Sequence, residues 1–225
     1  MPTPSTVIFD LDGTLVDTAP DLAGSVNVLL KRIGREPIDS AHIRPIISGG
    51  GRAMMARGLE MTGGPVTEAE LDDLFEQFIE HYAAHISAKS RPFPGVITAL
   101  EQLRARGARL AVCTNKRVSL AGKLLDELDM SRHFDFLAGG DSFPGIMKPD
   151  GRHVLSTIEK LGGDPAKAVM VGDSQADIGA AQAAKVPVVA VSFGYSDPPV
   201  ETFNPDRLID DFDELLPVMT ELLGG

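Results

Sequence analysis

The chain has 225 residues, of which 43% are hydrophobic and 24% charged, as in a globular protein with one large domain or a domain carrying a modest insertion. The formal net charge of −11 argues against a general binder of nucleic acid or membrane surfaces, and no apolar run approaches the roughly 18 residues that a membrane span needs. The single cysteine, Cys113, excludes an intramolecular disulfide and is expected to be a small buried hydrophobe. Because no signal-peptide pattern opens the sequence, we expect a cytoplasmic protein.

Short apolar runs with the character of buried strands recur along the chain. They lie at residues 7–9, 110–113, 136–138, 168–171 and 187–191. The runs are continuous rather than alternating, which is typical of strands covered on both faces. Helical stretches separate them, so the sequence predicts an α/β fold with a Rossmann-like parallel sheet and helices on both of its faces.

The stretch between the first two runs is longer than one crossover requires and has no strong strand signal. Residues 18–33 carry a helical apolar stripe with Thr18 as a candidate cap, and residues 67–86 carry another that opens with a Thr67/Glu70 capping box. A glycine-rich loop, residues 46–52, leads into a further helical piece. We therefore expect residues 16–90 to form an α-helical insertion in a core made of residues 1–15 and 91–225.

The remainder of the chain alternates helices with the predicted strands. Apolar periodicity predicts these helices at residues 96–107, 118–128, 150–161, 177–184 and 213–223. If the insertion moves relative to the core, the hinges should lie near residues 16–18 and 89–93.

Polar side chains follow three of the predicted strands, where Asp10, Thr114 and Asp173 stand. Ligands of open α/β sheets bind outside the carboxyl ends of the strands, so these three residues could meet at one edge. Asp12 follows Asp10 by two residues, and such a pair can divide nucleophilic attack and proton transfer between them. The alternative is a turn that uses aspartate and glycine for backbone reasons only.

Four short segments carry a resemblance to a known family. They are Asp10-Leu11-Asp12-Gly13-Thr14, Thr114-Asn115, Lys148-Pro149 and Gly172-Asp173-Ser174-Gln175-Ala176-Asp177. In their order and spacing, and in the position of the helical insertion, the chain resembles the haloacid dehalogenase-like phosphohydrolase superfamily over essentially its whole length. Within it, the stretches at residues 12–18, 113–116, 171–174 and 193–195 are most similar to bacterial phosphoglycolate phosphatases. The insertion would then be a cap domain.

This resemblance implies a phosphate monoester hydrolase that works through an aspartyl phosphate, with 2-phosphoglycolate as the first substrate to consider. Another small ester, such as a sugar or amino-sugar phosphate, and a phosphomutase on the same scaffold stay open. The implied partner is thus a small anionic phosphate ester, and the oligomeric state is left open. The implied cofactor is Mg²⁺, with Mn²⁺ as an alternative.

The resemblance also implies a role for each motif residue. Asp10 would be the nucleophile and Asp12 the general acid and base, while Thr114, the Asn115 amide and Lys148 would contact the phosphoryl group. Mg²⁺ would be held by Asp10, the carbonyl of Asp12, and Asp173. Asp177 would hold a metal-bound water or orient Lys148.

The helical insertion offers a weaker candidate site. Gly50 and Gly51 precede a helix and present amides to an anion, and Arg52 could bind a substrate carboxylate. The alternative is a flexible turn with a surface arginine. The role of Lys116 is left open. Lys185 stands where relatives usually have a helix-ending glycine, so it costs stability if the backbone there needs a positive φ.

Overall fold

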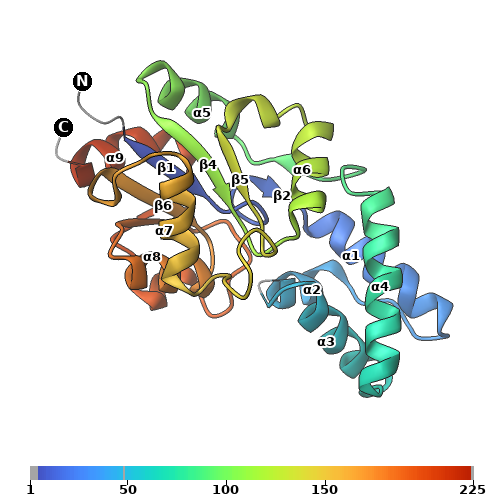
Figure 1. Cartoon of the computed structure of the whole chain (residues 1–225). Coiled ribbons are helices and arrows are strands. Elements are labelled where there is room, and N and C mark those ends of the chain that lie inside the picture. The colour runs from blue at the N-terminus through green and yellow to red at the C-terminus, as the bar shows by residue number, and fades with distance from the viewer. Residues whose placement is uncertain (1–4, 48, 224–225) are drawn as a thin grey trace. The chain divides into compact units, whose positions relative to one another are not determined.

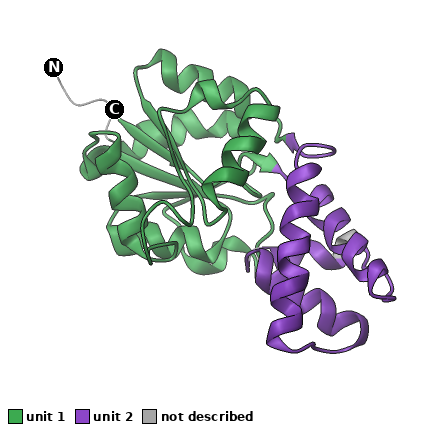
Figure 2. Cartoon of the chain, turned by 45° about the vertical axis from the view of Figure 1, so that its right-hand side comes forward, with its two compact units in different colours: residues 1–16, 92–225 green, residues 17–91 purple. Residues whose placement is uncertain are grey.

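The computed structural model describes residues 5–47 and 49–223 and contains two compact units. Figure 2 colours them separately. Unit 1 comprises the chain up to Val16 together with everything from Pro92 onward, and unit 2 comprises residues 17–91. The chain passes between them at β2 (Val16–Asp17) and β3 (Arg91–Pro92), which form a two-stranded sheet.

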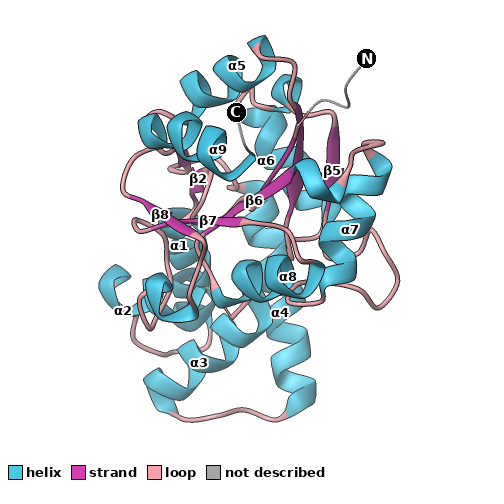
Figure 3. Ribbon diagram, turned by 90° about the vertical axis from the view of Figure 1, so that its left-hand side faces the viewer, coloured by secondary structure: helices cyan, strands magenta, loops and turns pink. Residues whose placement is uncertain are grey.

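Six parallel strands form the sheet of unit 1, in the order β5-β4-β1-β6-β7-β8 (Figure 1, with β7 and β8 labelled in Figure 3). They are β1 (Thr6–Phe9), β4 (Arg109–Cys113), β5 (Phe136–Ala138), β6 (Ala168–Gly172), β7 (Val188–Val191) and β8 (Arg207–Ile209). The five predicted apolar runs all lie in this sheet, which confirms the predicted fold class. The sixth strand, β8, was not predicted, because an edge strand of three residues that begins with Arg207 has little apolar signal.

Helices lie on both sides of this sheet (Figure 3). They are α5 (Val96–Ala105), α6 (Val118–Glu127), α7 (Gly151–Lys160), α8 (Gln175–Ala184) and α9 (Leu215–Leu223). On one face, Val154 of α7 and Ile178 of α8 share a buried cluster with Ile8 and Met170 of the central strands. Successive side chains along a strand point to opposite faces of the sheet, so Val7 and Phe9 face the other side. Short 3-10 helices add η1 (Ser131–His133), η2 (Pro165–Lys167), η3 (Val200–Phe203) and η4 (Phe212–Glu214).

The chain reverses its direction of travel across the sheet between β1 and β6. From β1 it continues to β4 and β5, and from β6 it continues to β7 and β8. In open α/β sheets the ligand crevice lies outside the carboxyl ends of the strands at such a reversal. Asp10 follows β1, Thr114 follows β4 and Asp173 follows β6, so all three predicted residues stand at this edge.

Unit 2 is helical. It contains α1 (Ala19–Arg32), α2 (Ser40–Ile47), α3 (Gly51–Gly63) and α4 (Glu68–Ala84). The α4 capping box is confirmed, since the extended Thr67 accepts from the Glu70 amide and the Glu70 side chain accepts from the Thr67 amide. The predicted side-chain cap at Thr18 is wrong. Its backbone is helical rather than extended, with φ −95° and ψ −7°, and its side chain makes no cap hydrogen bond.

The predicted loop at residues 46–52 is too long at both ends. Its first two residues belong to α2, a helix whose sequence signal is weakened by Pro45 inside it, and its last two residues belong to α3. Likewise α8 starts two residues before the predicted position, because Ser174 rather than a later residue is its N-cap. None of the helices among the described residues combines the length and apolar character that a membrane crossing requires.

Candidate active site

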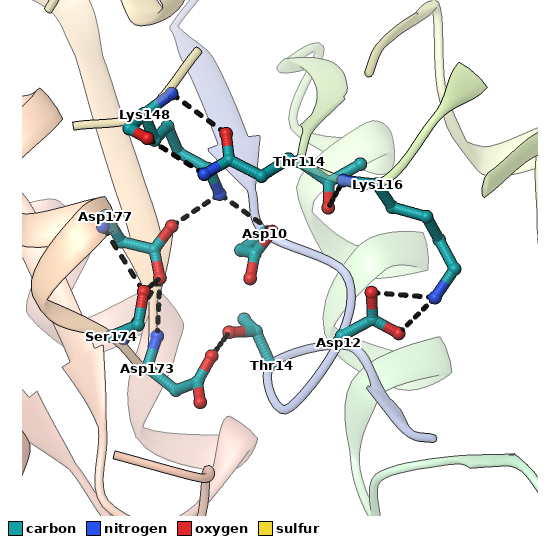
Figure 4. Close-up of polar contacts among 10 residues, drawn as sticks. Asp10, Asp12, Thr14, Thr114, Lys116, Lys148, Asp173, Ser174 and Asp177 are labelled. Atoms are coloured by element: carbon teal, nitrogen blue, oxygen red, sulfur yellow. Dashed lines mark hydrogen bonds and ion pairs between the residues drawn. The ribbon is translucent and has the colours of Figure 1, made fainter. Parts of the chain in front are cut away.

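A buried lysine joins two carboxylates at the carboxyl edge of the sheet. Asp10 leaves β1 with its amide still bonded to Val171 O, at 2.9 Å, which fixes where its side chain starts. Lys148, from the loop between β5 and α7, donates from Nζ to Asp10 Oδ1 at 2.7 Å and to Asp177 Oδ1 at 2.5 Å (Figure 4). All three side chains are buried. One cation therefore links the end of β1 to the first turn of α8.

Asp173 is held by donors from two separate loops. Its Oδ1 accepts from Thr14 Oγ1 at 2.9 Å, and its Oδ2 accepts from the Tyr195 amide at 2.8 Å. Two glycines leave room for this carboxylate. A Cβ on Gly13, whose φ is +85°, would lie 2.5 Å from Asp173 Oδ2, and one on Gly194 would lie 2.6 Å from Asp173 Cγ. The loops after β1 and β7 thus form the seat of Asp173.

Asp177 owes its position to the start of α8. It is the third residue of a capping box with Ser174, and its Oδ2 accepts from the Ser174 amide at 3.0 Å and from the Ser174 hydroxyl at 2.6 Å. Gly172 allows this side chain to fold back, because a Cβ there would lie 2.5 Å from Asp177 Cγ. With Oδ2 used by the cap, Oδ1 is directed to Lys148.

The carboxylates of Asp10, Asp173 and Asp177 form a buried cluster whose ligand atoms lie within 4.8 Å of one another. Burial raises the pKa of Asp10 to about 6, against the opposing effect of Lys148, and burial with the neighbouring Asp177 charge raises the pKa of Asp173 well above its usual value. The pKa of Lys148 is raised by the adjacent carboxylates, which outweigh its own burial, so it stays protonated. These ligands are all carboxylate oxygens, and they ionise less readily when no cation lies beside them. Such a set of ligands fits a hard divalent cation such as Mg²⁺.

The predicted phosphate-binding residues stand beside this cluster. Thr114 follows β4, with its amide bonded to Ala138 O at 2.9 Å, and its side chain is buried. The Asn115 side chain is directed elsewhere: its Nδ2 donates to Lys148 O at 2.8 Å and its Oδ1 accepts from Lys148 N at 2.9 Å. Only the backbone amide of Asn115 is left for the predicted phosphoryl contact. No local sequence pattern indicates this contact, because the two residues are 33 positions apart.

Asp12 is bound by a residue whose role the sequence analysis left open. Lys116 Nζ donates to both carboxylate oxygens of Asp12, at 2.6 and 2.8 Å, and Figure 4 shows the Asp12 carboxylate pointing toward this ammonium. Among the residues described, the buried metal-type cluster contains Asp177 and no side-chain oxygen of Asp12. That Asp12 would offer a metal its carbonyl rather than its carboxylate stays a prediction.

The remaining predicted residues, Gly50, Gly51 and Arg52, belong to unit 2. Gly50 caps α3 with φ +85°, and Arg52 lies in the first turn of that helix. Arg52 Nη2 forms ion pairs at 2.7 Å with both Glu68 and Asp72 of α4. The structure therefore gives Arg52 two carboxylate partners within its own unit, which the sequence analysis did not foresee.

Comparison of the sequence with known proteins identifies its family. Residues 7–191 match the family model of haloacid dehalogenase-like hydrolases. Over 216 residues the chain is 46% identical to a phosphoglycolate phosphatase of Agrobacterium fabrum, covering 96% of this chain and 92% of that protein. It is 44% identical over 208 residues to a phosphoglycolate phosphatase of Caulobacter vibrioides, covering 92% and 87% of the two chains.

Solved structures lead to the same family. The crystal structure of a predicted phosphoglycolate phosphatase from Haemophilus somnus matches with a TM-score of 0.89 at 33% identity, and the match covers 97% of this chain and 99% of that one. Sequence and structure comparisons thus agree over nearly the full length. The chain therefore belongs to the haloacid dehalogenase-like hydrolase family.

Proposed function

We propose that this enzyme is a Mg²⁺-dependent phosphatase that hydrolyses 2-phosphoglycolate to glycolate and phosphate. The observation that carries the proposal is the meeting of Asp10, Lys148, Asp173 and Asp177 at the carboxyl edge of the sheet. Its substrate rests on the 44–46% identity to phosphoglycolate phosphatases over at least 92% of the chain. In a protein of net charge −11 an anionic ester needs local positive charge, which Lys148, Lys116 and a bound Mg²⁺ would supply at the site.

In the first step Asp10 attacks phosphorus with a carboxylate oxygen. A new oxygen–phosphorus bond forms while the bond to the leaving glycolate oxygen breaks, and Asp12 gives that oxygen a proton. The Thr114 hydroxyl, the Asn115 backbone amide and the Lys148 ammonium would hydrogen-bond the phosphoryl oxygens. Positive charge and hydrogen bonds at this buried position stabilise the charge that develops there.

In the second step water cleaves the aspartyl phosphate. Asp12, now a carboxylate, takes a proton from the water that attacks phosphorus, and the phosphorus–Asp10 bond breaks to release phosphate and restore the Asp10 carboxylate. The aspartyl phosphate thus replaces one difficult displacement, direct hydrolysis, by two easier displacements. Asp177 keeps Lys148 in position through both steps, which its 2.5 Å contact supports.

Asp10, the Asp12 carbonyl and Asp173 would hold the Mg²⁺ ion. The two carboxylates fit such an ion, because they are buried together and their pKa values are raised in its absence. When bound, Mg²⁺ neutralises charge on the transferring phosphoryl group. Thr14 and the Tyr195 amide orient Asp173 toward this position.

Unit 2, residues 17–91, is proposed to be the cap that closes over the substrate. Its return segment is tied to α1, since the buried Asp21 carboxylate accepts from the amides of Lys89, at 2.9 Å, and Ser90, at 2.7 Å, and from the Ser90 hydroxyl at 2.7 Å. A segment held in this way moves with the helices of its own unit. Any hinge on the return side therefore belongs after Ser90, within the predicted residues 89–93.

The test is phosphate release from 2-phosphoglycolate, several sugar phosphates and an aryl phosphate, with and without Mg²⁺. We expect the highest kcat/KM for 2-phosphoglycolate, loss of activity after chelation, and no turnover by Asp10→Asn. Retained turnover in that variant would overturn the nucleophile. Mg²⁺-dependent hydrolysis of the aryl ester without preference for 2-phosphoglycolate would overturn the substrate alone, and slow hydrolysis with phosphoryl transfer between sugar hydroxyls would favour a mutase.

A further inference from the structure

We propose that Lys116 recognises the second anionic group of the substrate, the carboxylate of the phosphorylated acid. In the absence of substrate, the carboxylate of Asp12 forms an ion pair with this ammonium group. The arriving substrate carboxylate takes its place, which frees Asp12 to face the leaving oxygen. This inference rests on the proposed function, because it names the residue that would give that function its substrate preference.

The backbone of Lys116 is held by hydrogen bonds, and its side chain is buried. Its amide donates to Thr114 Oγ1 at 3.2 Å and its carbonyl accepts from the Gly140 amide at 2.9 Å, so the loop holds it at both ends of the residue. Its side chain is 7% exposed, whereas the Asp12 side chain that it binds is 20% exposed. An ion pair in such a place is screened less by water than one on the surface.

The charges already in place leave Lys116 as the cation suited to this task. Lys148 lies between Asp10 and Asp177, at 2.7 and 2.5 Å, so its charge serves the nucleophile and the phosphoryl group. A substrate with a phosphoryl and a carboxylate group needs a second cation for the second anion. Lys116 reaches the same Asp10–Asp12 loop from the end of β4 and supplies it.

Arg52, the residue that the sequence analysis favoured for this role, is less well suited. It is 44% exposed and already pairs with Glu68 and Asp72, so the group as a whole carries a net negative charge. An anion approaching this group meets one guanidinium and two carboxylates. Contacts at so exposed a position also contribute little to discrimination.

The exchange at Lys116 replaces one carboxylate by another, so the charge around the ammonium is unchanged. It makes the release of Asp12 depend on the second anion of the substrate. An ester without that anion leaves Asp12 bound to Lys116 and therefore reacts more slowly. Lys116 thereby sets the preference for carboxylated esters and acts as a specificity-determining residue.

The experiment compares 2-phosphoglycolate with phenyl phosphate in the full-length protein. In Lys116→Met we expect kcat/KM for 2-phosphoglycolate to fall about 30-fold, as for loss of one charge-assisted hydrogen bond, with most of the change in KM. For phenyl phosphate kcat/KM should stay within about threefold or rise. Calorimetry of ligand binding to Asp10→Asn, with and without Lys116→Met, gives a readout that needs no turnover. The double variant should bind 2-phosphoglycolate more weakly than the single variant does, whereas its binding of phenyl phosphate should be unchanged.

Three controls make the outcome decisive. Lys123→Met removes a lysine that pairs with Glu127 on the surface of α6, and it should leave both substrates unaffected. Lys116→Arg keeps the charge and should keep most of the preference, and thermal unfolding of each variant confirms folding. The proposal is overturned if Lys116→Met lowers both substrates equally, or neither, or if Arg52→Met is the variant that removes the preference. If the wild-type enzyme shows no preference at all, this inference and the proposed substrate fail together.

Discussion

Asn115 holds the backbone of Lys148 with both ends of its side-chain amide. The Asn115 Nδ2 atom donates to Lys148 O at 2.8 Å and Oδ1 accepts from Lys148 N at 2.9 Å. The loop after β4 thereby fixes the start of the lysine side chain that reaches Asp10 and Asp177. This side-chain amide pairs with the backbone much as a neighbouring strand would, at a point where the chain has left the sheet.

Replacing Asn115 by alanine should reduce catalysis more than it reduces stability. Removing both hydrogen bonds should lower the free energy of unfolding by about 1–2 kcal/mol. It should also lower kcat for an aryl phosphate by about tenfold or more, because Lys148 would no longer be held in position beside Asp10. Unfolding curves and steady-state kinetics measure the two effects.

The chain contains a matched control for this prediction. Asn27 makes the same pair of bonds to the backbone of Ile38 in unit 2, both at 2.8 Å. Asn27→Ala should therefore cost similar stability and leave kcat for the aryl ester within about twofold. Equal losses of kcat in the two variants would mean that Asn115 acts only through stability.

Gly194 should be required for metal affinity. A Cβ at this position would lie 2.6 Å from Asp173 Cγ, so alanine forces the carboxylate out of its seat between Thr14 and the Tyr195 amide. We expect Gly194→Ala to weaken Mg²⁺ or Mn²⁺ binding by about tenfold to a hundredfold in calorimetry. Gly122→Ala, where the nearest atom would be Leu137 Cδ2 at 3.7 Å, should bind the metal like the wild type.

Much of the fold follows from local patterns in the sequence. Continuous apolar runs marked five of the six strands, and the position of Asp10, Thr114 and Asp173 after three of them placed these residues at one edge. Burial and periodicity are properties of a short segment, so a single sequence reports them. Thr67 and Thr18 show the limit, because the same residue type caps α4 and fails to cap α1 when its backbone is already helical.

The partners of the site residues could not be predicted in the same way. Lys116 and Asp12 are 104 positions apart, and their contact depends on the paths of two loops that carry no periodic signal. The pairing of Arg52 with Glu68 and Asp72 depends likewise on how α3 packs against α4. Motifs thus identified which residues matter, while side-chain contacts between loops required the structure.

Lys185 should limit the stability of the protein. It ends α8 in the left-handed conformation, with φ 57° and ψ 37°, which favours glycine. Relieving the side-chain strain is worth about 1–2 kcal/mol, and the greater freedom of the unfolded glycine chain offsets about half of it. Lys185→Gly should therefore raise the free energy of unfolding by up to about 1 kcal/mol.

An alanine at the same position separates charge from conformation. Lys185→Ala removes the ammonium group and keeps the Cβ that the left-handed backbone disfavours. It should leave the free energy of unfolding unchanged or lower, in contrast to glycine. A gain of stability in the alanine variant would assign the effect to the lysine charge instead.

His153 should make the protein less stable in acid. It is fully buried in α7, with its ring 5.6 Å from that of Phe143, and burial together with the Lys148 charge lowers its pKa to about 4. The unfolded chain, with an ordinary histidine pKa near 6.5, therefore binds a proton between about pH 6.5 and 4 that the folded protein excludes. Stability is fully present above this range and is lost as the pH falls, by about 2 kcal/mol at roughly pH 5.

His153→Met tests this effect, because methionine is of similar size and does not titrate. The raised pKa values of Asp10 and Asp173 act in the opposite sense, so the informative quantity is the change in stability from pH 7 to pH 5 in each variant. We expect the variant to lose about 2 kcal/mol less than the wild type over this interval, whatever its stability at pH 7. An equal slope in His153→Met and in the wild type would show that His153 is protonated alike in the folded and unfolded states.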